Sequence, residues 1–391
     1  MASSLNDVES DFAVTLDLPP SCVQLCPAYP DYFVVGTYSL EQSDAVQGEG
    51  QISQSRNGSL VVFKLNGKDI EHIQTVSQPA AILDLRFHDS DKECANILAT
   101  VSSEGDLAIF KLDPGRDSRA PLQALASSRC DDLESDVLFL QCNWYPGRTN
   151  VIGVTTSTSL ARLLFLDNTW NIIRHVDIDI GNTLEAWSVA FAPVDVVTSQ
   201  PPGAVSMYCG GDDSQMRYTS VTLEGESDAN ISPFPPATLR GKHGAGVTAI
   251  LPLQYMHSDG GRLVVTGSYD DNLRLFSIKD LHETYGIPQV TEILTQNLEG
   301  GVWRLEVIES VSDGTTASIV LLASCMHAGC RILRLATQDN TEWTSEVLVK
   351  FTEHKSMNYG SACFQLGGSK LRCLSTSFYD KLLCLWDCDF S

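Results

Sequence analysis

The chain has 391 residues, of which 43% are apolar, and its 49 acidic and 26 basic side chains give a formal net charge of −23. A surface this acidic is repelled by phosphate backbones and by anionic lipid, which argues against a protein that binds nucleic acid or a membrane surface. No apolar run reaches the roughly 18 residues needed to cross a bilayer, and the polar start of the chain does not resemble a signal peptide.

A phrase of apolar strand, tight polar turn and second apolar strand recurs about every 50 residues. The turn positions are Asn57, Glu104, Ser159, Asp213, Asp270, His327 and Asp380. Hairpin-linked strands at this period predict an all-β, seven-bladed β-propeller of the WD-repeat type, because each blade buries its faces against its neighbours in a closed ring. A single propeller domain over residues 12–391 is therefore expected.

The two ends of the chain are predicted to meet in the last blade. Residues 1–11 are expected to be a disordered tail, and residues 12–18 alternate like a strand. The last blade ends at Trp386 without an outer strand, so residues 12–18 are predicted to supply it and remove two sheet edges. Within the first blade, residues 39–56 are rich in Gln, Ser, Gly and Glu and are expected to be a mobile surface insertion.

The remaining strands are expected where apolar runs are continuous or alternating, as is typical of strands between blades. In blade order, the runs are 32–38 and 58–63 in the first; 82–87, 97–101 and 107–110 in the second; 138–144, 151–155 and 161–166 in the third; 186–191 and 205–211 in the fourth; 247–251, 263–268 and 273–276 in the fifth; 302–308, 319–324 and 330–333 in the sixth; and 361–364, 371–376 and 382–386 in the seventh.

Two His–Asp pairs have the spacing of the buried polar network that holds WD-type turns. His243 precedes Asp270, and His354 precedes Asp380, by nearly the same interval. We interpret both pairs as structural, with catalysis as the alternative. Asp213 occupies the equivalent turn in the fourth blade and is expected to hold that turn, although it is also a candidate for substrate binding.

His327 stands at a turn position where Asp is usual. One interpretation is that its imidazole replaces the carboxylate in the same turn-holding bond. The other is a general base or acid facing the channel, because a histidine can take either role at neutral pH. Cys325 lies two positions earlier and could pair with it as a nucleophile, but a buried structural thiol is the favoured interpretation.

Aromatic residues and charges gather in the segments that open three blades. Glu185 and Trp187 open the fourth blade, Trp303 and Arg304 the sixth, and Tyr359 the seventh. Such segments surround one mouth of a propeller channel, where aromatic rings beside a carboxylate can hold a methylated ammonium by cation–π contact. Packing between blades is the alternative explanation for the rings, but it explains Glu185 and Arg304 less well.

The remaining signals are negative. None of the 12 cysteines is in a C-x-x-C motif, so reduced thiols and a cytoplasmic protein without a metal site are expected. The sequence also has no G-x-S-x-G, H-E-x-x-H, P-loop or G-x-G-x-x-G motif. Motifs alone would therefore describe a non-catalytic binding scaffold.

Several phrases nevertheless resemble, in order along the chain, those of the diphthine methyl ester methylesterases, a WD-repeat family of diphthamide biosynthesis. The matching segments are 35–41, 184–191, 210–213, 266–271, 300–304, 322–329, 353–360 and 377–380. The Glu-Ala-Trp, Gly-Gly-Val-Trp-Arg and Cys-Met-His phrases are the specific ones. The fourth blade departs from the family with Tyr218-Thr219, and the third with Ser159.

The resemblance implies an enzyme that hydrolyses a carboxylate methyl ester on the modified histidine of elongation factor 2, giving diphthine and methanol. In that reaction His327 is expected to activate water, and Arg304 to stabilise the oxyanion. Glu185, Trp187, Trp303 and Tyr359 are expected to hold the trimethylammonium group.

The same resemblance predicts a monomer that needs no cofactor. The competing hypothesis is a non-catalytic propeller that docks proteins, for example as an adaptor. A methyltransferase is disfavoured at this stage, because nothing in the sequence reads as a βαβ unit for S-adenosylmethionine.

Overall fold

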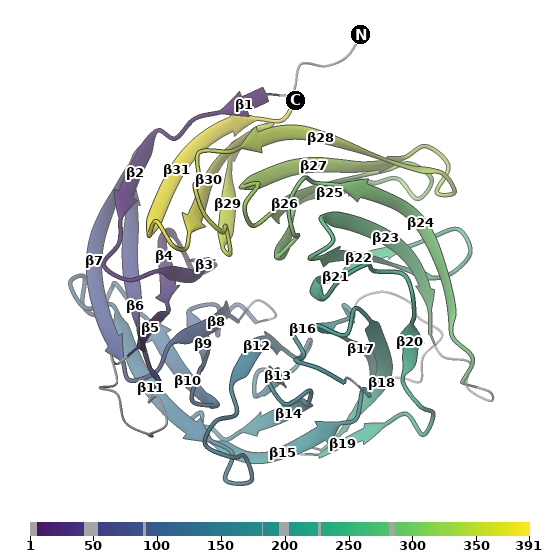
Figure 1. Ribbon diagram of the computed structural model, residues 1–391, viewed down its shortest axis with the longest axis horizontal. Coiled ribbons are helices and arrows are strands. Elements are labelled where there is room, and N and C mark those ends of the chain that lie inside the picture. The colour runs from purple at the N-terminus through teal and green to yellow at the C-terminus, as the bar shows by residue number, and fades with distance from the viewer. Residues whose placement is uncertain are drawn as a thin grey trace, which may run out of the picture.

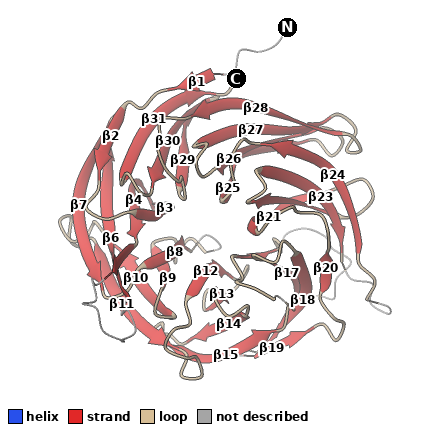
Figure 2. Cartoon of the chain, in the orientation of Figure 1, coloured by secondary structure: helices blue, strands red, loops and turns tan. Residues whose placement is uncertain are grey.

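The computed structural model describes residues 6–42, 54–88, 91–181, 183–194, 203–225, 228–280 and 286–391, and within these ranges it consists of strands, turns and loops without a helix (Figure 2). Seven sheets stand around a central axis, and the chain passes once around the ring from its N-terminus to its C-terminus (Figure 1). The predicted all-β, seven-bladed propeller is confirmed. No helix in the described part of the chain is long and apolar enough to span a membrane.

Each blade is built from strands that follow one another along the chain from the channel outward. Blade one holds β3 (Pro20–Cys26), β4 (Tyr29–Thr37), β5 (Ser39–Gln42), β6 (Gln54–Asn66) and β7 (Asp69–Gln78); blade two holds β8 (Ile82–Phe87), β9 (Ile97–Ser102), β10 (Asp106–Leu112) and β11 (Leu122–Arg129). Blade three holds β12 (Phe139–Trp144), β13 (Val151–Thr156), β14 (Ala161–Leu166) and β15 (Ile172–Ile178); blade four holds β16 (Ser188–Phe191), β17 (Ala204–Gly210), β18 (Met216–Glu224), β19 (Asp228–Ile231) and β20 (Ala237–Leu239).

The last three blades follow the same order. Blade five holds β21 (Val247–Met256), β22 (Arg262–Ser268), β23 (Asn272–Lys279) and β24 (Gln289–Asn297); blade six holds β25 (Arg304–Ser312), β26 (Ala317–Ser324), β27 (Cys330–Thr337) and β28 (Trp343–Phe351). Blade seven holds β29 (Ser361–Gly367), β30 (Lys370–Ser377) and β31 (Leu382–Asp389). The first strands of the blades therefore all run in one direction along the axis, and the segments that precede them gather at one mouth of the channel.

The N-terminal segment closes the ring as predicted. Strand β2 (Phe12–Thr15) pairs antiparallel with β31, with Phe12 opposite Leu385. A further strand, β1 (Asn6–Val8), pairs in parallel with β28 of blade six. The N-terminus thus ties two blades together, and the expected tail over residues 1–11 contains a strand, while residues 1–5 lie outside the described residues.

Two parts of the predicted insertion over residues 39–56 are also strand. β5 pairs with the first residues of β6 and extends the hairpin beyond the blade. Residues 43–53 lie outside the described part of the chain, so the expectation of a mobile insertion is not tested there.

The core lies between neighbouring blades, which explains why the middle strands are apolar along their whole length. Every residue of β22 is buried, whereas the outer strand β7 alternates between exposed and partly buried residues. Phe351 of blade six stacks on Trp386 of blade seven, with ring centroids 5.0 Å apart. Face-to-face packing of this kind fixes each blade against the next, and so fixes the position of the segments at the channel mouth.

The predicted His–Asp pairs hold their turns through intermediaries. The imidazole of His243 shares a hydrogen bond with the Thr266 hydroxyl at 2.9 Å. Asp270 accepts instead from the backbone N–H of Gly244 at 2.6 Å and from Arg274 at 2.7 Å. Loop and turn are joined as expected, but the ion pair with Arg274 occupies the carboxylate that sequence reasoning assigned to the histidine.

Blade seven repeats this arrangement. His354 shares a hydrogen bond with the Ser375 hydroxyl at 2.8 Å, and the indole N–H of Trp386 donates to the same hydroxyl at 3.1 Å. Asp380 accepts from the backbone N–H of Lys355 at 3.4 Å. Burial lowers the pKa of both histidines to about 4, so both imidazoles are neutral near pH 7.

Candidate functional site: an aromatic mouth above a charged channel

Aromatic rings from four blades meet at the mouth where the first strands of the blades begin. Trp303 is at the centre: its ring centroid lies 5.5 Å from that of Trp187, 5.9 Å from that of Tyr269 and 4.9 Å from that of Tyr359. Phe378 extends the group beyond Tyr359 at 5.4 Å. We call these five residues the aromatic mouth, and all of them are partly exposed.

The structure brings together the three aromatic residues singled out from the sequence, Trp187, Trp303 and Tyr359. Sequence reasoning missed Tyr269 and Phe378. Tyr269 follows the second strand of blade five, in a phrase that reads as generic to propellers. The antiparallel pairing of Val247 with Ser268 brings this turn back to the mouth, where the backbone N–H of Val302 donates to the Ser268 carbonyl at 3.0 Å.

A carboxylate stands at one end of the aromatic mouth. A Cβ built on Gly246 would lie 2.8 Å from Oδ1 of Asp212 and 2.9 Å from the ring of Tyr269, so both groups crowd the same glycine. Burial raises the pKa of Asp212; the indole N–H of Trp187 lowers it, and the charge of Glu185 raises it. That buried indole nitrogen makes no hydrogen bond of normal geometry.

Glu185 and Asp213 contribute differently to this end. Glu185 is partly buried, and its backbone carbonyl accepts the N–H of Asp212 at 3.0 Å. The Asp213 side chain is only 5% exposed and forms an ion pair with Arg217 at 2.7 Å. It also accepts the backbone N–H of Thr183 at 3.1 Å. Asp213 therefore holds the turn, and its neighbour Asp212, which sequence reasoning passed over, is the carboxylate beside the rings.

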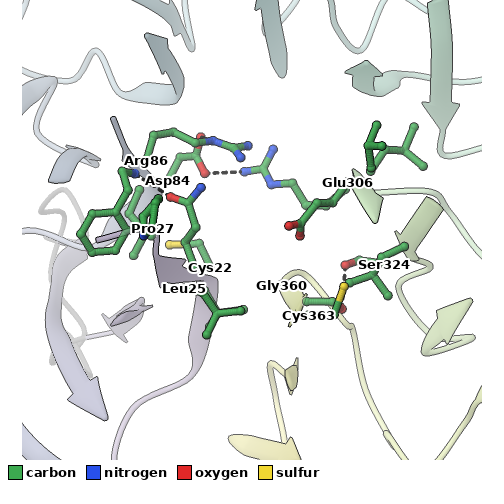
Figure 3. A pocket seen from close by; sticks show the side chains of 18 of the residues that line it. Cys22, Leu25, Pro27, Asp84, Arg86, Glu306, Ser324, Gly360 and Cys363 are labelled. Carbon is green, nitrogen blue, oxygen red and sulfur yellow. Dashed lines mark hydrogen bonds and ion pairs between the residues drawn. The ribbon is translucent and has the colours of Figure 1, made fainter. Parts of the chain in front are cut away.

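Below the mouth, the channel opens into a cavity of about 550 Å³ lined mainly by β3, β8, β25 and β29. Asp84 of β8 is 2% exposed and lies 3.0 Å from Arg304 of β25 and 3.4 Å from Arg86. Figure 3 shows Asp84 and Arg86 on one side of this cavity and Glu306 on the other. Arg304, which was predicted from the sequence, is thus ion-paired across the channel, and its partner Asp84 was not predicted.

Glu306 is the fourth charged residue of the cavity. It follows Arg304 by two positions on β25, and alternate residues of a strand face the same side, so both point into the channel. Its side chain is exposed to the channel and enclosed by the walls of the cavity. This enclosure raises the pKa of Glu306 to about 7, and the charge of Arg86 acts in the opposite direction.

The aromatic mouth adjoins the cavity. The guanidinium carbon of Arg304 lies 5.8 Å from the ring centroid of Trp303. Tyr359, which packs against Trp303, also lines the cavity. Tyr359 is therefore shared by the aromatic mouth and the wall of the cavity.

His327 lies apart from these contacts. It is exposed in the turn between β26 and β27, and it has no hydrogen-bond or ion-pair partner within the described ranges. Cys325 is fully buried, and burial raises the pKa of its thiol. The two side chains therefore offer no thiolate–imidazole pair. The role of His327 stays a prediction.

One group of potential metal ligands occurs in the described part of the chain, at Cys130, Asp132 and His175 in blade three. The buried guanidinium of Arg162 donates to both carboxylate oxygens of Asp132, at 2.9 and 2.7 Å. A metal cation bound here would be repelled by the positive charge of Arg162. We therefore interpret the three residues as part of an ion-pair network and not as a metal site.

No protein-family model matches the chain. It is 25% identical to the diphthine methyltransferase homolog of Dictyostelium discoideum over 95% of this chain and 97% of that protein. It is also 25% identical to the diphthine methyltransferase of Schizosaccharomyces pombe, over 95% of each chain, and to that of Homo sapiens over 89% of this chain and 73% of the human protein. Among solved structures, Sqt1 from Chaetomium thermophilum superposes with a TM-score of 0.61 at 13% identity, covering 97% of this chain and 99% of that one, which shows the propeller fold.

These names correct the predicted enzyme class. The relatives are named methyltransferases, which contradicts the ester hydrolase expected from the sequence and also the rejection of a methyltransferase. The matching phrases lie at turns and at the channel mouth, and they do not specify the reaction. A methyltransferase was disfavoured because the sequence has no βαβ unit, but such a unit is only one way in which a protein can hold a methyl donor.

Proposed function

We propose that this protein acts on the diphthine residue of elongation factor 2 and alters its methylation during diphthamide biosynthesis. The names of its relatives support the pathway and the methyl-group chemistry. The observation that carries the proposal is the aromatic mouth with Asp212 beside it, because diphthine bears a trimethylammonium group.

A trimethylammonium group carries a charge but has no N–H to donate. It is bound by aromatic faces and by a carboxylate at longer range, with about 1–2 kcal/mol for each ring when water is excluded. Trp187, Tyr269 and Trp303 provide such rings from three blades, and Asp212 provides the charge. The net charge of −23 also favours the approach of a cationic group.

Methyl transfer also requires a methyl donor. An adenosyl donor is ordinarily held by a glycine-rich turn between a parallel strand and a helix. The described ranges contain no helix, so their residues do not fit that kind of donor site. The described residues instead offer aromatic rings and a carboxylate that suit the trimethylammonium group of diphthine.

The proposal is tested with purified protein and elongation factor 2 that carries diphthine or its over-methylated form. Binding is measured by titration, and the mass of the modified peptide shows whether one methyl group is gained or lost. Trp303→Leu should weaken binding about 5- to 30-fold, the equivalent of 1–2 kcal/mol. Tyr255→Leu is the matched control, because it removes a ring near the opposite end of β21, where Tyr255 contacts Ser310.

Equal binding of modified and unmodified elongation factor 2 would refute recognition of diphthine. Binding that depends on Trp303 without any mass change would instead favour the non-catalytic propeller.

A further inference from the structure

We propose that Cys363 and Cys373 of blade seven form a reversible thiol-oxidation site, in which a peroxide converts the two thiols into a disulfide between neighbouring strands. Neither cysteine has a part in the proposed function. The register of the two strands, the contacts of the thiols and their unequal burial support the site.

The two cysteines lie directly opposite each other on the inner strands of blade seven, Cys363 on β29 and Cys373 on β30. Three positions along the same ladder, the backbone N–H of Thr376 donates to the carbonyl of Gly360 at 2.9 Å. Hydrogen-bonded and non-hydrogen-bonded pairs alternate in an antiparallel ladder, so the cysteines form a non-hydrogen-bonded pair, with Cα atoms about 4.5 Å apart. A disulfide bridges Cα atoms that are about 4.4–6.8 Å apart, so the backbone already has a suitable spacing.

Cys373 is the centre of a group of three thiols. Its side chain is hydrogen-bonded to the thiols of both Cys363 and Cys388. Cys388 lies on β31 diagonally across the ladder, because the residue directly opposite Cys373 is Trp386. Diagonal Cα atoms are about 7–8 Å apart, which is too far for a disulfide unless the backbone moves. The register therefore selects Cys363 as the partner of Cys373.

The two thiols differ in their access to a small oxidant. Cys363 is partly exposed and lines the channel cavity (Figure 3), whereas Cys373 is fully buried. Burial, together with the neighbouring thiols, raises the pKa of the Cys373 thiol well above its ordinary value, so this side chain stays protonated and does not react first. Oxidation therefore begins at Cys363.

The oxidation takes two steps and releases water in each. The Cys363 thiolate attacks one oxygen of hydrogen peroxide; the S–O bond forms as the O–O bond breaks, and the released hydroxide takes up the thiol proton as water. The Cys373 sulfur then attacks the sulfur of the sulfenic acid. The S–S bond forms as the S–O bond breaks, and the leaving hydroxide takes up the Cys373 proton as a second water. The two thiols together lose two electrons, which the peroxide gains.

The experiment treats the full-length protein with hydrogen peroxide, alkylates the remaining thiols in urea and weighs the tryptic peptides by mass spectrometry. Trypsin cleaves after lysine and arginine, so the three thiols fall in different peptides: 356–370 for Cys363, 373–381 for Cys373, and 382–391 for Cys388 together with Cys384. We expect the first two peptides to be joined, at a mass two hydrogen atoms below their sum, and to separate when dithiothreitol is added.

Two variants test the assignment. Cys363→Ser should abolish the joined peptide and leave Cys373 fully alkylated, because the buried thiol then lacks the partner that peroxide reaches. Cys388→Ser is the matched control, because it removes the other thiol in contact with Cys373 and should retain the joined peptide.

A link between peptides 373–381 and 382–391 in place of the expected one would overturn the inference. So would a wild-type protein in which peroxide oxidises Cys363 without joining the peptides, or oxidises neither cysteine. The wild-type measurement remains decisive if a variant does not fold.

Discussion

The buried histidines of blades five and seven predict a specific loss of stability in weak acid. His243 and His354 are 6% and 5% exposed, and burial lowers the pKa of each from 6.5 to about 4. Between these values the unfolded chain binds a proton that the folded chain does not. The contribution of each neutral histidine to the unfolding free energy is therefore complete above pH 6.5 and is lost as the pH falls toward 4. At pH 5 each histidine should cost about 2 kcal/mol of unfolding free energy.

The effect can be separated from that of the carboxylates. Although burial acts to raise it, the Arg274 guanidinium and the Gly244 N–H lower the pKa of Asp270 from its ordinary 3.8 to about 2, so its contribution to stability declines only below pH 3.8. Urea unfolding at pH 7 and pH 5 should show that His354→Gln loses about 2 kcal/mol less between the two conditions than the wild-type protein. His72→Gln, at an exposed histidine, is the control and should retain the full loss. If His354→Gln retains the full wild-type loss, the neutral buried imidazole is not its source.

Two further changes test the ion pair of blade four and the cavity. Asp213→Ala removes the ion pair with the buried Arg217 and the bond from the Thr183 N–H, and should lower the unfolding free energy by about 3–5 kcal/mol; a loss below about 1 kcal/mol in urea titration would contradict the turn-holding role. Burial raises the pKa of Glu306 from 4.5 to about 7, so the folded protein holds a proton that the unfolded chain has lost between these values, and stability falls as the pH rises through them. Glu306→Gln should therefore gain unfolding free energy relative to the wild-type protein between pH 5 and pH 8 in urea titration; an equal change in both proteins would exclude Glu306.

The fold could be predicted almost completely from the sequence. The repeated turn positions specify the blades, because a strand buried on both faces must be apolar throughout, and that pattern survives substitution at single turns such as Ser159 and His327. Closure by β2 also followed from the unpaired edge left at Trp386. The pairing of β1 with β28 could not be predicted, since three residues carry too little periodicity to register as a strand.

The site was predicted only in part, for a geometric reason. Trp187, Trp303 and Tyr359 stand directly before the first strands of their blades, so the repeat alone places them at one mouth. Asp212 was not predicted because its neighbour Asp213 occupies the repeat position and was itself taken as the candidate carboxylate. The reaction class could not be predicted, because the phrases that carry the resemblance lie at turns and at the channel mouth and do not specify a reaction.

The channel charges did leave a signal in the sequence. In β8, Asp84 and Arg86 alternate with apolar residues, and in β25, Arg304 and Glu306 do the same. A strand that packs between blades has no use for charge at every second position, so such a pattern indicates a face turned to the channel. Recognising that the two faces meet required the closed ring, because Asp84 and Arg304 are 220 residues apart.

The ion pair between Asp84 and Arg304 bears on function because a buried ion pair is weak evidence for a role in stability. Blades two and six are not neighbours, so the pair spans the channel, and Asp84 also accepts the backbone N–H of Cys142 in blade three at 3.3 Å. Removing Asp84 from water costs several kcal/mol, and well-packed apolar residues in place of a buried pair are often as stable or more so. A propeller does not need this pair to close. Its place beside Trp303, with a second arginine facing the cavity, is what a site for a small charged ligand requires.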